Sequence, residues 1–126
     1  MPRFNYMVLA RPKPGREAEY DQWHREVHVD DVLKIPGMVA CTRYRLLDPQ
    51  PDGQPPRWLF ASIYEVDAED PAAPLAEMKR RVGTDLMPMT DASDSAHTLR
   101  LMFEPLSRHE AKAHGAADAE EAHGLR

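Results

Sequence analysis

The stretch that decides the fold is residues 14–46, PGREAEYDQWHREVHVDDVLKIPGMVACTRYRL. It opens on a proline–glycine turn, after which the chain takes up a helical period. The residues at i, i+3, i+4 and i+7 that mark this period are Tyr20, Trp23, His24 and Val27. The spacing predicts a helix over residues 16–28 that turns these four side chains toward the core.

The rest of the same stretch predicts a short apolar turn and then a strand. Asp30 is a suitable cap for the apolar piece at residues 32–35, which a second proline–glycine pair ends. From residue 38 to residue 47 the side chains alternate with period two, so we expect a strand there.

Working outward, alternation predicts three more strands, over residues 3–11, 58–66 and 97–106. Residues 48–57 hold four prolines and a glycine and predict a long loop. Asp70 followed by Pro71 predicts the start of a second helix that runs to about residue 82. Residues 84–95 read as an irregular loop over a pocket.

The predicted element order is therefore β-α-β-β-α-β. This is the split βαβ arrangement of a ferredoxin-like α+β fold, a four-stranded antiparallel sheet with two helices on one face. The strands are apolar on both faces, so we expect both faces of the sheet to be buried against other parts of the protein. A second copy of the chain is the simplest cover for the face without helices. We predict one domain over residues 1–106 and a flexible or partner-docking tail over residues 107–126.

Composition narrows the class of protein. The 126 residues carry 16 Lys and Arg against 21 Asp and Glu, a net charge of -5, which argues against a nucleic-acid partner. No apolar run is long enough for a membrane span, and the N-terminus does not read as a signal peptide. The single cysteine, Cys41, is interpreted as buried and structural. Together these features predict a cytoplasmic location.

The region from Arg11 to Tyr44 resembles the EthD-like branch of the dimeric α+β barrel proteins. Members tend to show an aromatic residue, a histidine, an acid, an apolar pair and a Pro-Gly pair before the second strand. The matching positions here are Trp23, His28, Asp31, Val32 with Leu33, and Pro36 with Gly37. The stretch LFASIYEVDAEDPAAPLAEM also looks like the third strand and second helix of that branch, so the resemblance covers residues 3–106. One departure is a second histidine, His24.

The resemblance implies a homodimer in which two sheets pack face to face. It also implies a small aromatic or polyketide-like ligand between sheet and helices. Related families include cofactor-free monooxygenases, cyclases, isomerases and decarboxylases. We therefore expect a cofactor-independent lyase or isomerase that works by proton transfer beside a carbonyl, with cofactor-free oxygenation as a variant. A non-catalytic small-molecule-binding accessory protein is the alternative.

His24 and His28 are the first candidates for this chemistry. Four residues apart, they share one helix face, and a partly buried imidazole makes a usable acid or base near neutral pH. We expect His28 to be the main acid or base and His24 its partner, with Asp31 orienting a ring. Packed core histidines are the competing interpretation.

The strands supply the remaining candidates. Tyr64 or Arg43 would support a developing oxyanion. The expected substrate-binding residues are Tyr6, Trp23, Phe60 and His97. Filling of the core is the competing interpretation for the aromatic side chains.

No cofactor motif is present in the sequence, so no cofactor is expected. Two histidines at i and i+4 could chelate a metal, with Asp31 or His97 as a third ligand. However, Glu26 does not occupy the place that the HExxH or HxxEH zinc signatures require. A metal-dependent enzyme using His24 and His28 as ligands stays a further alternative.

Overall fold

The computed structural model describes residues 3–113 of the chain. Its elements in chain order are β1 (Arg3–Ala10), α1 (Glu17–Trp23), a π-helical turn η1 (His24–His28), α2 (Val29–Leu33), β2 (Met38–Arg45), β3 (Phe60–Asp67), α3 (Ala72–Arg81), a 3₁₀ turn η2 (Ser95–His97) and β4 (Leu99–Phe103). The predicted β-α-β-β-α-β order is confirmed. Within the described residues, no helix is both long and apolar enough to cross a membrane.

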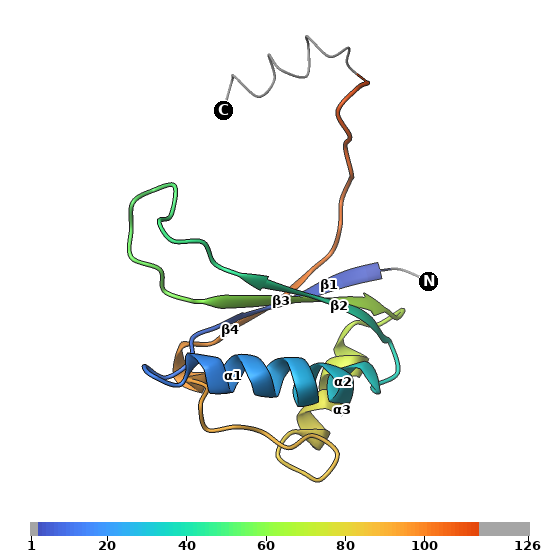
Figure 1. The fold of residues 1–126 in the computed structure, drawn as a ribbon. Helices are drawn as coiled ribbons and strands as arrows, with labels where there is room; N and C mark the ends of the chain where they lie inside the picture. The colour runs from blue at the N-terminus through green and yellow to red at the C-terminus, as the bar shows by residue number, and fades with distance from the viewer. Residues whose placement is uncertain (1–2, 114–126) are drawn as a thin grey trace.

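The four strands form one antiparallel sheet in the order β2-β3-β1-β4. All the helices lie against one face of this sheet (Figure 1). At the centre, Tyr6 on β1 pairs with Tyr64 on β3 and with Met102 on β4. Because side chains alternate across a strand, this register turns all three toward the helices. The predicted four-stranded sheet with helices on one face is confirmed.

The core lies between the sheet and the helices. Fully buried side chains from α2, the turn after it and β3 meet there: Val32, Ile35, Tyr64 and Val66. Met87, from the segment after α3, is also fully buried. Gly37 begins the return to the sheet at a φ of 97°, and a Cβ there would lie 2.9 Å from Pro74 Cγ. Only glycine suits both that backbone and that close approach.

The first helix differs from the sequence prediction in length and in phase. It continues without a break to Leu33, whereas the sequence predicted that the helix ends at residue 28 and that Asp30 caps a separate short piece. Its π turn is marked by the Val29 N–H, which donates to the His24 carbonyl five residues back. A π turn holds about one residue more than an α turn. The inward-facing positions therefore fall at steps of four: Tyr20, His24, His28 and Val32. The prediction that Val27 faces inward was wrong, since its side chain is 37% exposed.

Within residues 3–113, the opposite face of the sheet carries no helix. It is a continuous apolar surface, here called the open face, formed by Met7, Leu9, Tyr44, Ala61, Ile63, Leu99, Leu101 and Phe103. The predicted loop between β2 and β3 and residues 104–113 after β4 both extend on this side, away from the helices (Figure 1). The predicted tail falls mostly on residues 114–126, which lie outside the described residues.

Candidate functional site

A cavity of about 110 Å³ lies between the helix-covered face of the sheet and the first helix. The sheet contributes Tyr6, Val8, Tyr64 and Arg100 to its wall, Thr98 joins them from just before β4, and the first helix contributes Tyr20, Trp23, His24, His28 and Val32. Met78 from α3 closes one side. The remaining lining residues, Val82, Met89 and Ser93, belong to residues 82–93, here called the roof segment. The predicted loop over a pocket is thus present.

His24 is a buried histidine with both ring nitrogens occupied. Arg43 Nε donates to Nδ1 at 3.0 Å, so the neutral ring carries its proton on Nε2, because a guanidinium cannot accept. That Nε2–H points to Ser62 Oγ at 3.1 Å, with the Tyr64 hydroxyl at 3.4 Å. Burial, with the charges of His28 and Arg43, lowers the pKa of His24 to about 3. The ring therefore stays neutral and acts as a fixed hydrogen-bond partner.

Arg43 is held in turn by the first helix. Its Nη2 donates to Asp21 Oδ1 at 2.5 Å, and that hydrogen bond lowers the pKa of the Asp21 carboxyl. The guanidinium thus joins β2 to the helix through both Asp21 and His24. Because both groups already engage it, Arg43 does not reach into the cavity, whose lining excludes it.

His28 has very different surroundings. Its ring stacks on Trp23 with centroids 4.5 Å apart and an interplanar angle of 23°. Nδ1 is buried, yet it has no hydrogen-bond partner among residues 3–113. Burial is the main cause that lowers the pKa of His28 to about 4, with Asp31 opposing and Arg100 adding to the shift. At neutral pH the ring is uncharged and has unused hydrogen-bonding capacity at the cavity wall.

Asp31 lies one helical turn after His28. Its Oδ2 is also buried without a hydrogen-bond partner in the described part of the chain, while Oδ1 lies 3.7 Å from Lys34 Nζ. The Asp31 charge raises the pKa of His28, so the two groups interact through space. Within one helical turn, the structure thus places two buried polar atoms that both lack a hydrogen-bond partner among residues 3–113.

The cavity tyrosines keep their protons at neutral pH. Burial raises the pKa of Tyr6 and of Tyr64, and it raises the pKa of Tyr20 to about 12. Each hydroxyl can therefore donate a hydrogen bond to a bound oxygen atom. Tyr6 and Tyr64 lie side by side on neighbouring strands, on the same face of the sheet, with ring centroids 6.3 Å apart.

Arg100 is a cavity residue that was not among the sequence candidates. It lies on β4 opposite Val8 and lines the cavity while remaining exposed. Its positive charge opposes the rise that burial causes in the pKa of Tyr6 and Tyr20, and it adds to the fall in the pKa of His28. Alternation had placed it on the same face as Met102, and a lone charge on an apolar strand face is the signal that would have identified it.

Two of the sequence candidates lie elsewhere. Phe60 stacks on Tyr20 in a second apolar cluster and does not line the cavity. His97 sits in η2 ahead of β4, mostly exposed, with its Nδ1 at 2.8 Å from Asp94 Oδ2. The strand at this edge begins at Leu99, two residues later than predicted, and the odd-numbered positions of β4 turn to the face away from the helices, so His97 does not reach the cavity.

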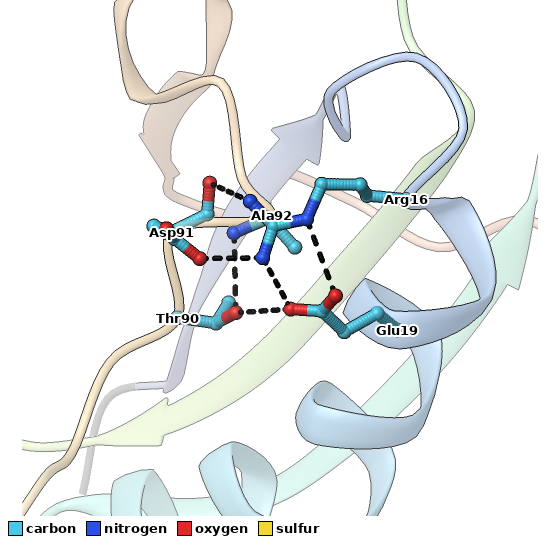
Figure 2. Close-up of polar contacts among 5 residues, drawn as sticks. All are labelled: Arg16, Glu19, Thr90, Asp91 and Ala92. Carbon is cyan, nitrogen blue, oxygen red and sulfur yellow. Dashed lines mark hydrogen bonds and ion pairs between the residues drawn. The ribbon is translucent and has the colours of Figure 1, made fainter.

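The roof segment is fixed to the first helix by polar contacts. Trp23 Nε1 donates to the Pro88 carbonyl at 3.2 Å. Figure 2 shows Arg16 between the carboxylates of Glu19 and Asp91, each at 2.5 Å from Nη2. In the same network, the Thr90 hydroxyl oxygen accepts a hydrogen bond from the Ala92 N–H at 3.1 Å. These contacts set the position of the cavity's roof.

The metal alternative finds no ligand set in this arrangement. Within residues 3–113, His, Cys, Asp and Glu side chains nowhere form a group of three or more that could hold a metal ion. His24 has both nitrogens engaged, and His97 lies outside the cavity. The residues present therefore do not fit a metal centre built on His24 and His28.

Comparison with known proteins gives the fold. No protein-family model and no curated protein matches the chain. Among solved structures, it is similar to an ethyl tert-butyl ether D (EthD) family protein from Bacillus halodurans, at a TM-score of 0.55 and 14% identity over 82% of this chain and 99% of that one. The match to HapK from Hahella chejuensis spans 90% of this chain and 100% of that one at 10% identity, and its TM-score of 0.45 is too low to infer a shared fold. The predicted resemblance to EthD-like proteins is confirmed for the fold.

Proposed function

We propose that the chain is a cofactor-independent acid–base enzyme, a lyase or isomerase, acting on a small aromatic or polyketide-like molecule. One observation carries the proposal: an uncharged histidine, His28, lines an aromatic cavity with hydrogen-bonding capacity that no described residue uses. A neutral imidazole beside a bound carbonyl compound can remove a proton from the neighbouring carbon.

The roles of the other residues follow from their contacts. Asp31 would hold a proton on Nδ1 of His28 after a small side-chain rotation, which would leave the Nε2 lone pair as the base. His24 becomes a positioning residue, because both its nitrogens are already hydrogen-bonded. Tyr64 and Tyr6 would donate to the oxygen on which negative charge develops, in place of Arg43, which the sequence had also suggested for this role.

The direct test is exchange of carbon-bound hydrogen for deuterium beside a carbonyl. A panel of small aromatic ketones and enones is incubated with the protein in D₂O and followed by NMR. Wild type should incorporate deuterium into at least one compound, and His28→Asn should lower that rate by about 10²-fold or more. His97→Asn is the matched control, because it removes an imidazole outside the cavity. A His28→Asn protein that exchanges at the wild-type rate would remove His28 from the mechanism. Oxygen uptake in the same assay would indicate the oxygenase variant.

A non-catalytic binding role is the second candidate, and the low pKa of His28 favours it. A base whose pKa is about 4 has less driving force for proton removal at pH 7 than one tuned near neutrality. Saturable ligand binding without deuterium exchange or oxygen uptake for any compound of the panel would support this role over the enzyme.

We also propose that the chain works as a homodimer through the open face. On that face Leu99, Leu101 and Phe103 are each more than a third exposed, next to Met7 and Leu9. A contiguous apolar sheet face of this kind is costly to leave in water. Light scattering should give the mass of two chains, and Leu101→Lys should give one. Leu86→Lys, at an exposed leucine outside the sheet, is the control. A monomeric wild type would contradict the proposal.

A further inference from the structure

We infer that the cavity recognises a small planar anion, an aromatic or unsaturated carboxylate, and that Arg100 is the residue that selects the negative charge. The inference rests on the proposed binding role of the cavity and names the chemical class of its ligand. Three observations support it: Arg100 has no ion-pair partner among residues 3–113, the cavity has the size of a small planar group, and no second permanent cation is among the lining residues.

The first observation is that Arg100 has no acid to neutralise it. It forms neither an ion pair nor a side-chain hydrogen bond with any of residues 3–113, whereas Arg3, Arg16, Arg43 and Arg81 each pair with an acid. Arg16 is held by Glu19 and Asp91, and Arg43 by Asp21. A guanidinium that lines a cavity and keeps its donors free is ready to bind a carboxylate through two parallel hydrogen bonds.

The second observation is the size and chemistry of the space. A cavity of about 150 Å³ with apolar walls holds one benzene molecule. Here a smaller volume, about 110 Å³, lies among the rings of Tyr6, Tyr20, Trp23 and Tyr64, which suits a short unsaturated chain or one planar ring that projects partly into the mouth. Because Arg100 is exposed, its guanidinium lies where the cavity meets solvent. A ligand would therefore place its flat part inside and its carboxylate at the mouth.

The third observation is electrostatic. Among the lining residues only Arg100 carries a permanent positive charge. Both cavity histidines are neutral above about pH 5, and the three tyrosines are protonated donors. The influence of Arg100 on the pKa of Tyr6, Tyr20 and His28 indicates that its field reaches across the cavity. A neutral isostere of the anion would lose that interaction while keeping the same packing.

The experiment compares benzoate with benzamide, which matches it in shape but is uncharged. Titration calorimetry or ligand NMR at low salt should show benzoate binding wild type at least tenfold more tightly than benzamide. Added salt should reduce this preference, because Arg100 is exposed to screening ions. In Arg100→Gln the affinity for benzoate should fall to that for benzamide, while benzamide binding stays unchanged. Arg45→Gln is the matched control, since Arg45 is an exposed sheet arginine that does not line the cavity.

Each outcome decides the inference. Equal affinities for the two probes in wild type, a preference that survives in Arg100→Gln, or no binding of either probe up to millimolar concentration would overturn it. Circular dichroism would show that Arg100→Gln is folded. Binding is measured without turnover, so the proposed enzyme can fail while the anion preference holds. Conversely, His28-dependent deuterium exchange without any anion preference would retain the enzyme and reject the inference.

Discussion

The surroundings of His24 and His28 differ sharply, although the two rings lie one turn apart with centroids at 5.4 Å. His24 is 3% exposed and has Arg43 on one nitrogen and Ser62 on the other. His28 stacks on Trp23 and leaves Nδ1 without a partner in the described chain. Burial lowers the pKa of both, so burial alone does not distinguish them. The difference lies in hydrogen bonding: one ring serves the structure, and the other has capacity left for a ligand.

The largest expected effect is on stability and should separate the two histidines. His24→Ala would leave the Arg43 Nε–H donor and the Ser62 hydroxyl acceptor without their partner and open a hole in the core. We expect it to lower the free energy of unfolding by about 2–4 kcal/mol. His28→Ala breaks no hydrogen bond within residues 3–113 and should cost about 1–2 kcal/mol, mainly through lost packing on Trp23.

Urea unfolding of the two variants beside wild type measures both changes. Equal losses would contradict the division between a structural and an available histidine.

The next effect is the pH dependence of stability. Both histidines titrate at lower pH in the folded chain, about 3 and about 4, than the ordinary value of 6.5. Between pH 6.5 and 4 the unfolded chain therefore binds more protons, so stability rises with pH across this window and levels off above it. At pH 5 each histidine should contribute a loss of about 2 kcal/mol relative to pH 8.

Comparing His28→Asn with wild type isolates one histidine, because the carboxylates titrate alike in both proteins. The variant should lose roughly half of the slope between pH 5 and 6.5. A slope that is unchanged in the variant would place His28 in water rather than in the partly buried site described.

The smallest expected effect concerns the support behind His24. Asp21→Asn removes the carboxylate that holds Arg43, but this pair is partly exposed, with side chains 25% and 40% accessible. We expect a loss of about 0.5 kcal/mol or less, measured by thermal unfolding.

A more specific readout is the ¹⁵N spectrum of His24, which should still show its proton on Nε2, because Arg43 Nε can only donate to Nδ1. A switch of the proton to Nδ1 in Asp21→Asn would show that Asp21 controls the tautomer after all.

The sequence predicted the fold, and five of its candidate residues lie in the cavity wall, because both depend on periodicity. Alternation turned Tyr6 and Tyr64 to one face of the sheet, and helical spacing turned Trp23 and His24 to meet them. Alternation also put Arg100 on the helix-covered face of the sheet. Whether an acid neutralises its charge, however, depends on which distant segments of the chain come near it. Those contacts have no trace in local spacing.

The exposure of Val27 and the pairing of Arg43 could not be predicted for related reasons. A 3.6-residue period describes an unbroken α-helix, whereas η1 adds a residue to one turn. Arg43 faces the helix as alternation required, yet its contact with both Asp21 and His24 depends on how strand and helix are placed in space. Roles that depend on tertiary contacts had to wait for the structure.

The π turn also makes chain length part of the site. Deleting one residue between His24 and His28 would return the helix to an α period, and because the π turn holds one residue more than an α turn, the helix on either side would keep its phase relative to Tyr20. Val32 would stay in the core, but the two imidazoles would stand three residues apart, about 60° from each other around the helix, with every named side chain still present. In an alignment, a single gap in this turn would therefore mark a cavity whose two rings are arranged differently.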